Sequence, residues 1–147
     1  MQQQFLGFDH IDTRVRRLKD VEEFYQRLMP ALGLPNAHYA YVDERGEWDY
    51  DLSAHPYNVV EFHQEVAGQA AFFIGFIEDP NMHAVNTRIA FRVASKEDLP
   101  RWHAFLESIG AVNIEPSLSE GYPAIFFEDA CGTKLEICAR LARSVNG

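Results

Sequence analysis

His10, Arg88 and Glu136 are the residues of this chain whose types could do chemistry together. Each lies in a stretch where apolar and polar residues alternate, which is typical of a β-strand with one buried face. The three expected strands cover residues 5–15, 87–94 and 133–139. An imidazole and a carboxylate on polar strand faces suit a divalent metal ion or acid–base catalysis. The alternative is a solvated sheet face that carries surface ion pairs.

Further polar residues on or near these strands could bind a ligand. Arg14 follows His10 on the same strand face, and Arg92 follows Arg88. Tyr122 lies in a Gly-Tyr-Pro loop, where an aromatic side chain could form an apolar wall. Because arginine recognises carboxylates through two parallel N–H bonds, we predict substrate-binding roles for Arg14, Arg88, Arg92 and Tyr122.

The two halves of the chain repeat one order of elements. A helical pattern after the first strand ends at Gly33, and a second one ends at Gly110. His10 and Gly33 are 23 positions apart, and Arg88 and Gly110 are 22 apart. The other expected strands cover residues 38–43, 57–64, 71–78, 112–117 and 123–129. The sequence therefore predicts an α+β fold, with one domain over residues 1–147 made of two βαβββ modules at about 5–80 and 86–140.

The repeat also predicts where a site would form. We expect each helix to cover the apolar face of its own sheet. The opposite faces would then form a curved mixed sheet around a cleft lined by the polar sides of the strands. Residues 44–56 are expected to form a long loop or an extra hairpin.

The charge and composition of the chain limit the kinds of partner and compartment that we expect. The net charge of −9 argues against nucleic acid and anionic membranes as partners. Cys131 and Cys138 have no zinc-type spacing, so we expect free thiols in a reducing compartment. The first residues lack the pattern of a secretory signal, and the longest apolar run, at 70–77, is too short to span a bilayer. We expect a cytoplasmic protein.

Three segments together resemble the vicinal oxygen chelate superfamily, the group of glyoxalase I, extradiol dioxygenases and bleomycin-resistance proteins. They are Phe8-Asp-His-Ile, Arg88-Ile-Ala-Phe-Arg-Val and Asp129-Ala-Cys-Gly-Thr-Lys-Leu-Glu-Ile. The resemblance spans nearly the whole chain. It implies paired βαβββ modules, a small-molecule ligand and a homodimer. It also implies a metal held by His10 from the first strand and Glu136 from the last.

Arg88 departs from the superfamily pattern, which has a histidine ligand at this position. A permanent guanidinium cation removes a ligand and repels a metal ion. One interpretation keeps a metal ion (Fe, Zn, Ni or Mn) and draws a replacement ligand from Glu61, His63 or His83. Glu61 and His63 share one face of their strand, although this is the third strand of its module rather than the fourth. His38, His55 and His103 fit no ligand spacing, so we expect no ligand role for them.

The resemblance implies a metal-dependent lyase, isomerase or dioxygenase. In such an enzyme, a metal at His10 and Glu136 would polarise a substrate oxygen, and Glu136 would be a catalytic residue. The alternative is a metal-free protein that binds a small molecule or confers resistance. There, Arg88 would pair with Glu136 or with an anionic ligand.

Overall fold

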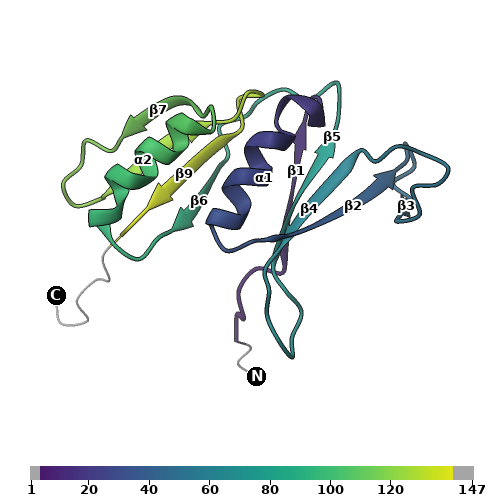
Figure 1. The fold of residues 1–147 in the computed structure, drawn as a ribbon, viewed down its shortest axis with the longest axis horizontal. Coiled ribbons are helices and arrows are strands. Elements are labelled where there is room, and N and C mark those ends of the chain that lie inside the picture. The colour runs from purple at the N-terminus through teal and green to yellow at the C-terminus, as the bar shows by residue number, and fades with distance from the viewer. Residues whose placement is uncertain (1–3, 141–147) are drawn as a thin grey trace. The chain divides into compact units, whose positions relative to one another are not determined.

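The computed structural model describes residues 4–140, and the chain divides into two compact units, Met1–Met82 and His83–Gly147. Each unit has the order strand, helix, strands (Figure 1). The first contains β1 (His10–Val15), α1 (Glu22–Ala31), β2 (Asn36–Val42), β3 (Trp48–Asp49), β4 (Val59–His63) and β5 (Phe73–Glu78). The second contains β6 (Arg88–Arg92), α2 (Leu99–Ser108), β7 (Val112–Pro116), β8 (Ala124–Glu128) and β9 (Lys134–Cys138). Short 3₁₀ turns, η1 (Leu18–Asp20) and η2 (Lys96–Asp98), precede the helices.

The two sheets have matching topologies. Their strand orders are β1-β5-β4-β2-β3 and β6-β9-β8-β7. The first strand of each unit pairs in parallel with the last, and the remaining pairs are antiparallel. The predicted α+β class with a repeated βαβββ order is confirmed. The short strand β3 pairs with β2 and forms the extra hairpin expected within residues 44–56.

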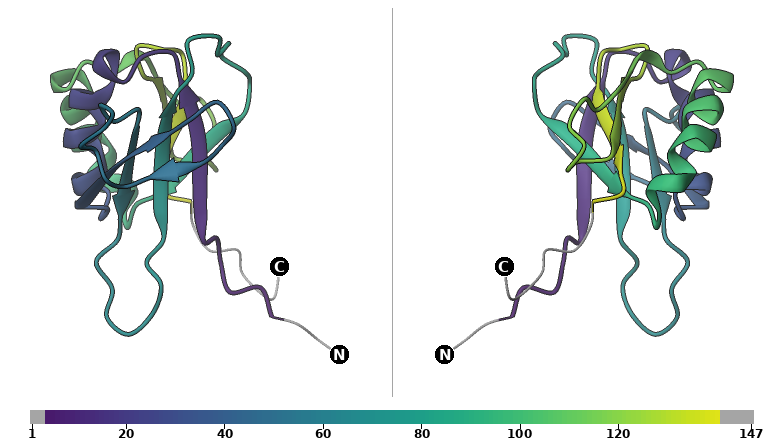
Figure 2. Two further views of the ribbon diagram at one scale, coloured as in Figure 1. Left: turned by 90° about the vertical axis from the view of Figure 1, so that its right-hand side faces the viewer. Right: turned by 90° about the vertical axis from the view of Figure 1, so that its left-hand side faces the viewer.

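The helix α1 lies against one face of the first sheet (Figures 1 and 2). Tyr25 of α1 stacks on Phe76 of β5, with ring centroids 3.8 Å apart. Phe62 of β4 packs edge-on against the same Phe76 ring, and all three side chains are buried. Because side chains alternate along a strand, Glu61 and His63 beside Phe62 must point to the opposite face.

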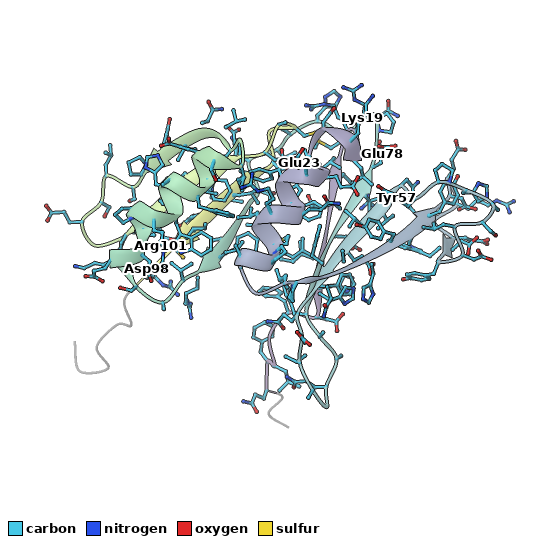
Figure 3. The ribbon with its side chains drawn as sticks, viewed as in Figure 1. Lys19, Glu23, Tyr57, Glu78, Asp98 and Arg101 are labelled. Carbon is cyan, nitrogen blue, oxygen red and sulfur yellow. The ribbon has the colours of Figure 1, made fainter. Side chains whose placement is uncertain are left out.

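The helix α2 follows a capped turn. The Ser95 hydroxyl accepts a hydrogen bond from the Glu97 backbone N–H, and Pro100 occupies the first turn, where no N–H is needed. An ion pair of 3.1 Å between Arg101 and Asp98 lies at the same end (Figure 3). Both α1 and α2 have ten residues, and within residues 4–140 no helix combines the length and apolarity needed to cross a membrane.

The first strand is shorter than the sequence predicts. It begins at His10, and the preceding Phe5, Leu6 and Phe8 are exposed. Gly7 has φ +105°, a left-handed conformation that interrupts an extended strand. The predicted strand over residues 5–15 is therefore too long at its N-terminal end.

Replacing Leu106 by Ala should destabilise the protein because the Leu106 side chain is fully buried under α2. Loss of its packing is expected to reduce the free energy of unfolding by about 2–5 kcal/mol. Leu118→Ala is the matched control, since Leu118 is 99% exposed, and should change it by less than about 0.5 kcal/mol. Urea unfolding followed by circular dichroism measures both, and equal effects would contradict this description of the core.

Candidate metal centre

Three potential metal ligands meet on the face of the first sheet opposite α1. In the strand register, His38 of β2 pairs with Glu61 of β4, Glu61 with Gly75 of β5, and Gly75 with Asp12 of β1. These four residues form one row across the sheet. His63 lies two positions after Glu61 and therefore shares its face. The register thus brings His38, Glu61 and His63 together from two adjacent strands.

The distances within this trio suit coordination of one ion. The His63 Nε2 atom lies 3.1 Å from Glu61 Oε1, and the His38 and His63 rings stack with centroids 4.3 Å apart. One ligand atom from each residue lies within 4.8 Å of the other two. Within residues 4–140, no other group of three histidine, cysteine or acidic side chains meets this condition. Glu61 is buried, His63 is half-buried and His38 is exposed.

The donor types fit a transition-metal ion. Two imidazoles and one carboxylate are found in catalytic zinc sites and in non-haem iron sites, where other coordination positions stay open. Neighbouring ligand atoms around a tetrahedral zinc ion lie about 3.4 Å apart, given bonds of about 2.1 Å. The contact between His63 and Glu61 already has this spacing. His38 is exposed, so a side-chain rotation could bring its nitrogen to the same ion.

Two neighbouring residues shape the surroundings of this trio. Phe73 stacks on His63 and on His10, with centroids 4.5 Å apart in each case, and so fixes the plane of the His63 ring. Gly75 leaves space between the two carboxylates in its row. A Cβ atom at Gly75 would lie 2.8 Å from Asp12 Oδ1 and 3.6 Å from Glu61 Cγ. Asp12 therefore leans over Gly75 toward the candidate centre.

His10, one of the two predicted metal ligands, lies between two carboxylates. Its Nδ1 atom is 2.6 Å from Asp9 Oδ2, and its Nε2 atom is 3.6 Å from Asp12 Oδ2. The hydrogen bond to Asp9 raises the pKa of His10, and the charges of Asp12, Asp9 and Glu61 raise it further. This environment favours the imidazolium form, which has no free lone pair for a metal.

Glu136, the other predicted ligand, is buried on β9 with 5% of its surface exposed. The Tyr122 hydroxyl donates a hydrogen bond of 2.6 Å to Glu136 Oε1, so the structure brings these two predicted site residues together. His10 belongs to the first unit and Glu136 to the second. A metal shared by His10 and Glu136 stays a prediction.

The predicted substrate-binding arginines lie in different surroundings. Arg88 lies over the Phe126 ring, with its guanidinium carbon 4.5 Å from the ring centroid. Arg88 pairs in register with Lys134, whereas Glu136 pairs with Ala90. Arg92 is exposed on β6. In the first unit, Arg14 borders an acidic hollow of about 640 Å³.

His38 is the candidate ligand that sequence reasoning missed. Its strand was expected, but its partner strand was not assigned. The pairing of β2 with β4 is the signal that identifies it, because that pairing sets His38 directly opposite Glu61. His83, proposed as a replacement ligand, lies before β6 in the second unit and is not part of the trio.

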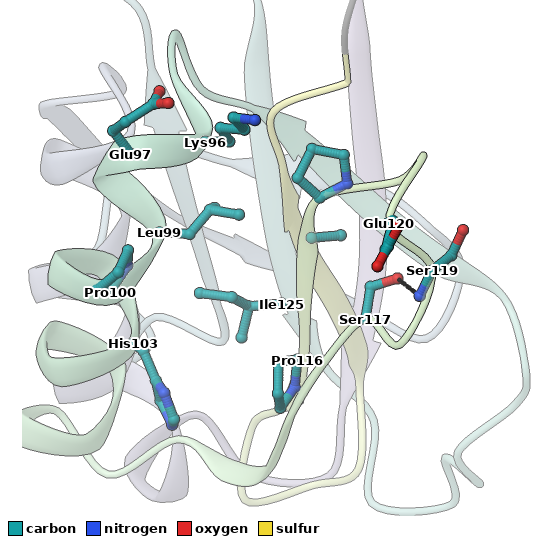
Figure 4. A pocket seen from close by; sticks show the side chains of 12 residues that line it. Lys96, Glu97, Leu99, Pro100, His103, Pro116, Ser117, Ser119, Glu120 and Ile125 are labelled. Carbon is teal, nitrogen blue, oxygen red and sulfur yellow. Dashed lines mark hydrogen bonds between the residues drawn. The ribbon is translucent and has the colours of Figure 1, made fainter.

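A separate hollow of about 540 Å³ lies in the second unit, between α2 and the segment that joins β7 to β8 (Figure 4). Leu99, Pro116 and Ile125 form much of its apolar wall, and Lys96 and Glu120 lie at its margin. The candidate metal centre lies instead on a face of the first sheet. The apolar hollow and the candidate ligands are therefore distinct features.

The hydrogen bond to Glu136 raises the pKa of Tyr122 to about 12, from an ordinary value of 10. Stabilisation from this raised pKa is complete below pH 10 and is lost as the pH rises through about 12. The chain has six tyrosines. In a spectrophotometric titration, Tyr122→Phe should reduce the absorbance change near pH 12 by the amount that one tyrosine contributes.

Tyr57 is the matched control for this titration. Its hydroxyl donates to Glu22, and that hydrogen bond raises the pKa of Tyr57 to about 12. Tyr57→Phe should remove the same amplitude as Tyr122→Phe, and the double variant should remove both. An unchanged amplitude near pH 12 in Tyr122→Phe would show that Tyr122 does not donate to Glu136.

No family model matches the sequence, and no curated protein matches it. Solved structures do match. A glyoxalase/bleomycin resistance protein from Albidiferax ferrireducens is 18% identical, with a TM-score of 0.60 over 91% of this chain and 98% of that one. The FosX fosfomycin resistance protein from Listeria monocytogenes, in a hexagonal crystal form, is 18% identical, with a TM-score of 0.60 over 97% of this chain and 98% of that one.

A mutant of the same FosX was solved in complex with Mn(II) and 1S,2S-dihydroxypropylphosphonic acid. It is 18% identical to this chain, with a TM-score of 0.56 over 94% of this chain and 93% of that one. Likenesses at this identity establish the fold. The fold that the sequence resemblance implies is confirmed, and the chain has the glyoxalase/bleomycin resistance fold.

Proposed function

We propose that this protein is a metal-dependent enzyme that acts on a small oxygen-bearing molecule, with a divalent cation held by His38, Glu61 and His63. The observation that carries the proposal is the set of three ligand atoms within 4.8 Å of one another. The Mn(II) complex of FosX supports it, since that protein has the same fold. We further propose that the cation is a transition metal such as Zn, Mn or Fe, which accepts mixed imidazole and carboxylate ligands.

When bound, a cation of this type acts as a Lewis acid toward a substrate oxygen. One carboxylate and two neutral imidazoles leave a divalent ion with a net positive charge. Three protein ligands also leave coordination positions open to a substrate. The role of His38, Glu61 and His63 is therefore to hold the ion on the sheet face while leaving it accessible.

Residues beside the trio could move a proton. The Asp12 carboxylate leans over Gly75 toward Glu61 and could accept a proton from a substrate near the ion. Tyr50 could donate one. Partial desolvation raises the pKa of Tyr50, and the nearby charges of Glu61 and Asp12 raise it further. These residues would give the site an acid and a base on one face.

Titration of metal-free protein with Zn²⁺ and Mn²⁺ tests the site. The wild type should bind one ion per chain, and His63→Ala and Glu61→Ala should each weaken binding by about 100-fold or more, because each removes a ligand. His103→Ala is the matched control, since His103 lies on α2 beside Glu107, and should leave affinity within about twofold.

Variants at the predicted pair separate the two locations for the metal. His10→Ala and Glu136→Gln should leave the stoichiometry unchanged if the ion binds at His38, Glu61 and His63. Loss of metal in these variants, with normal binding in His63→Ala, would contradict the proposal and support the pair implied by the superfamily resemblance.

A metal-free binding protein is the second candidate function. The observation that favours it is Arg88, which occupies the expected position of a histidine ligand and lies over Phe126. In this case, a small anionic molecule would bind to Arg88 without any metal. Absence of stoichiometric metal binding by the wild type would favour this candidate over the enzyme.

A further inference from the structure

A third hollow, of about 220 Å³, lies in the second sheet and shares no residue with the proposed metal centre. Its lining residues are Arg88, Asn113, Glu115, Phe126, Phe127, Glu128 and Lys134. We propose that this hollow is a binding site for a small oxyanion, held by the guanidinium of Arg88 and the ammonium of Lys134. All of its residues belong to the second unit, so the inference is independent of the metal centre proposed on the first sheet, and it deepens the second candidate function at Arg88.

The two cations of this hollow are direct neighbours. Arg88 of β6 and Lys134 of β9 pair in the strand register, so both side chains lie on the same face of the sheet. Like charges opposite each other on neighbouring strands destabilise a sheet. An anion placed between them would relieve that repulsion. Glu128 pairs with Lys134, so the part of this repulsion left for a bound anion to relieve is at Arg88.

The Glu128 carboxylate forms an ion pair with Lys134, whereas its charge acts on Arg88 only from beyond ion-pair distance. Lys134 Nζ lies 3.2 Å from Glu128 Oε1, and the Asn113 side-chain amide donates to the other oxygen of Glu128. Glu128 is thus directed toward Lys134 and Asn113. Among residues 4–140, no carboxylate lies at ion-pair distance from Arg88. The guanidinium is left with donors for a ligand.

Stacking prepares Arg88 for two-point binding. The Phe126 ring covers one face of the guanidinium at 4.5 Å, which holds its plane and leaves its N–H edge free. A guanidinium edge matches a carboxylate or phosphate group through two parallel hydrogen bonds. The fixed orientation lowers the entropy lost when an oxyanion binds.

Asn113 lines the same hollow and has an unusual backbone conformation. It has φ 51° and is the sole residue other than glycine with positive φ among those that the structure describes. It lies where the pairing of β7 with β8 becomes irregular. Asparagine adopts this left-handed conformation more readily than most residues. In this position its side-chain amide donates to Glu128, which orients that carboxylate.

The size and wall of the hollow restrict the ligand. A volume of 220 Å³ equals about seven waters, at about 30 Å³ each, and admits only a small molecule. Glu115 on the wall would repel a second negative charge and accept a hydrogen bond. The site therefore suits one oxyanion group on a molecule that also carries a hydroxyl. A carboxylate and a phosphate share this chemistry.

Calorimetric titrations with acetate, glycolate and inorganic phosphate, in a chloride buffer at low ionic strength, test the proposal. The wild type should bind glycolate or phosphate in the millimolar range or more tightly, and glycolate more tightly than acetate because its hydroxyl can reach Glu115. A preference between glycolate and phosphate identifies which oxyanion the site recognises.

Substitutions at Arg88 distinguish what its charge contributes to oxyanion affinity from what its paired hydrogen bonds contribute. Arg88→Gln should weaken binding at least about tenfold, and Arg88→Lys should restore only part of it because a lysine cannot make the paired hydrogen bonds. Arg101→Gln is the matched control, since Arg101 lies on α2 paired with Asp98, and should leave affinity within about twofold. Lys134→Gln gives a second test if Arg88→Gln fails to fold.

The same titrations on His63→Ala, which disrupts the proposed metal centre, should give unchanged oxyanion affinity. A loss of oxyanion binding in His63→Ala would place the anion on the first sheet and overturn the inference. Absence of saturable binding by the wild type, or binding unaffected by both Arg88→Gln and Lys134→Gln, would also overturn it.

Discussion

The pairing register of β2, β4, β5 and β1 determines which side chains share the candidate metal centre. Glu61 and His63 flank Phe62, which is buried against Phe76 on the face that α1 covers. A slip of one residue in β4 would expose Phe62 and bury two ionisable groups under the helix. The packing of the apolar core on one face of the sheet therefore determines which side chains lie on the polar face.

The two units share one topology but differ in where they place a carboxylate. Gly75 on β5 and Glu136 on β9 occupy equivalent positions in the two sheets. Gly75 pairs with Asp12, the third residue of β1, and Glu136 pairs with Ala90, the third residue of β6. In the first unit, the carboxylate is supplied one strand further along, by Glu61, whose counterpart in the second unit is Phe126. Gly75 leaves the space that Asp12 uses, whereas Phe126 gives Arg88 a ring to stack on. The same topology thus presents the candidate metal ligands on the first sheet and the neighbouring Arg88 and Lys134 on the second.

Much of the fold could be predicted from the sequence because its signals are local. Gly33 and Gly110 follow the helices with positive φ, and Asp129 accepts hydrogen bonds from the backbone of Cys131 and Thr133 in the predicted turn between β8 and β9. The start of α1 has no such local signal, because Asp20 binds Arg17 and no side chain caps the helix.

The metal-ligand trio could be predicted only in part. Alternation placed Glu61 and His63 on one strand face, but His38 joins them through a strand pairing that closes the long connection over residues 43–58. No local pattern sets the register across a connection of that length. The stacking of Arg88 on Phe126 depends in the same way on the sheet order β6-β9-β8, which no single segment encodes.

Anomalous diffraction at the zinc absorption edge, from crystals grown with Zn²⁺, tests the central claim most directly. The account predicts one strong anomalous peak bonded to nitrogen atoms of His38 and His63 and to an oxygen of Glu61, at about 2.0–2.2 Å. A peak at Glu136 or His10 with none at His63, or no peak bonded to any of the trio, would contradict it.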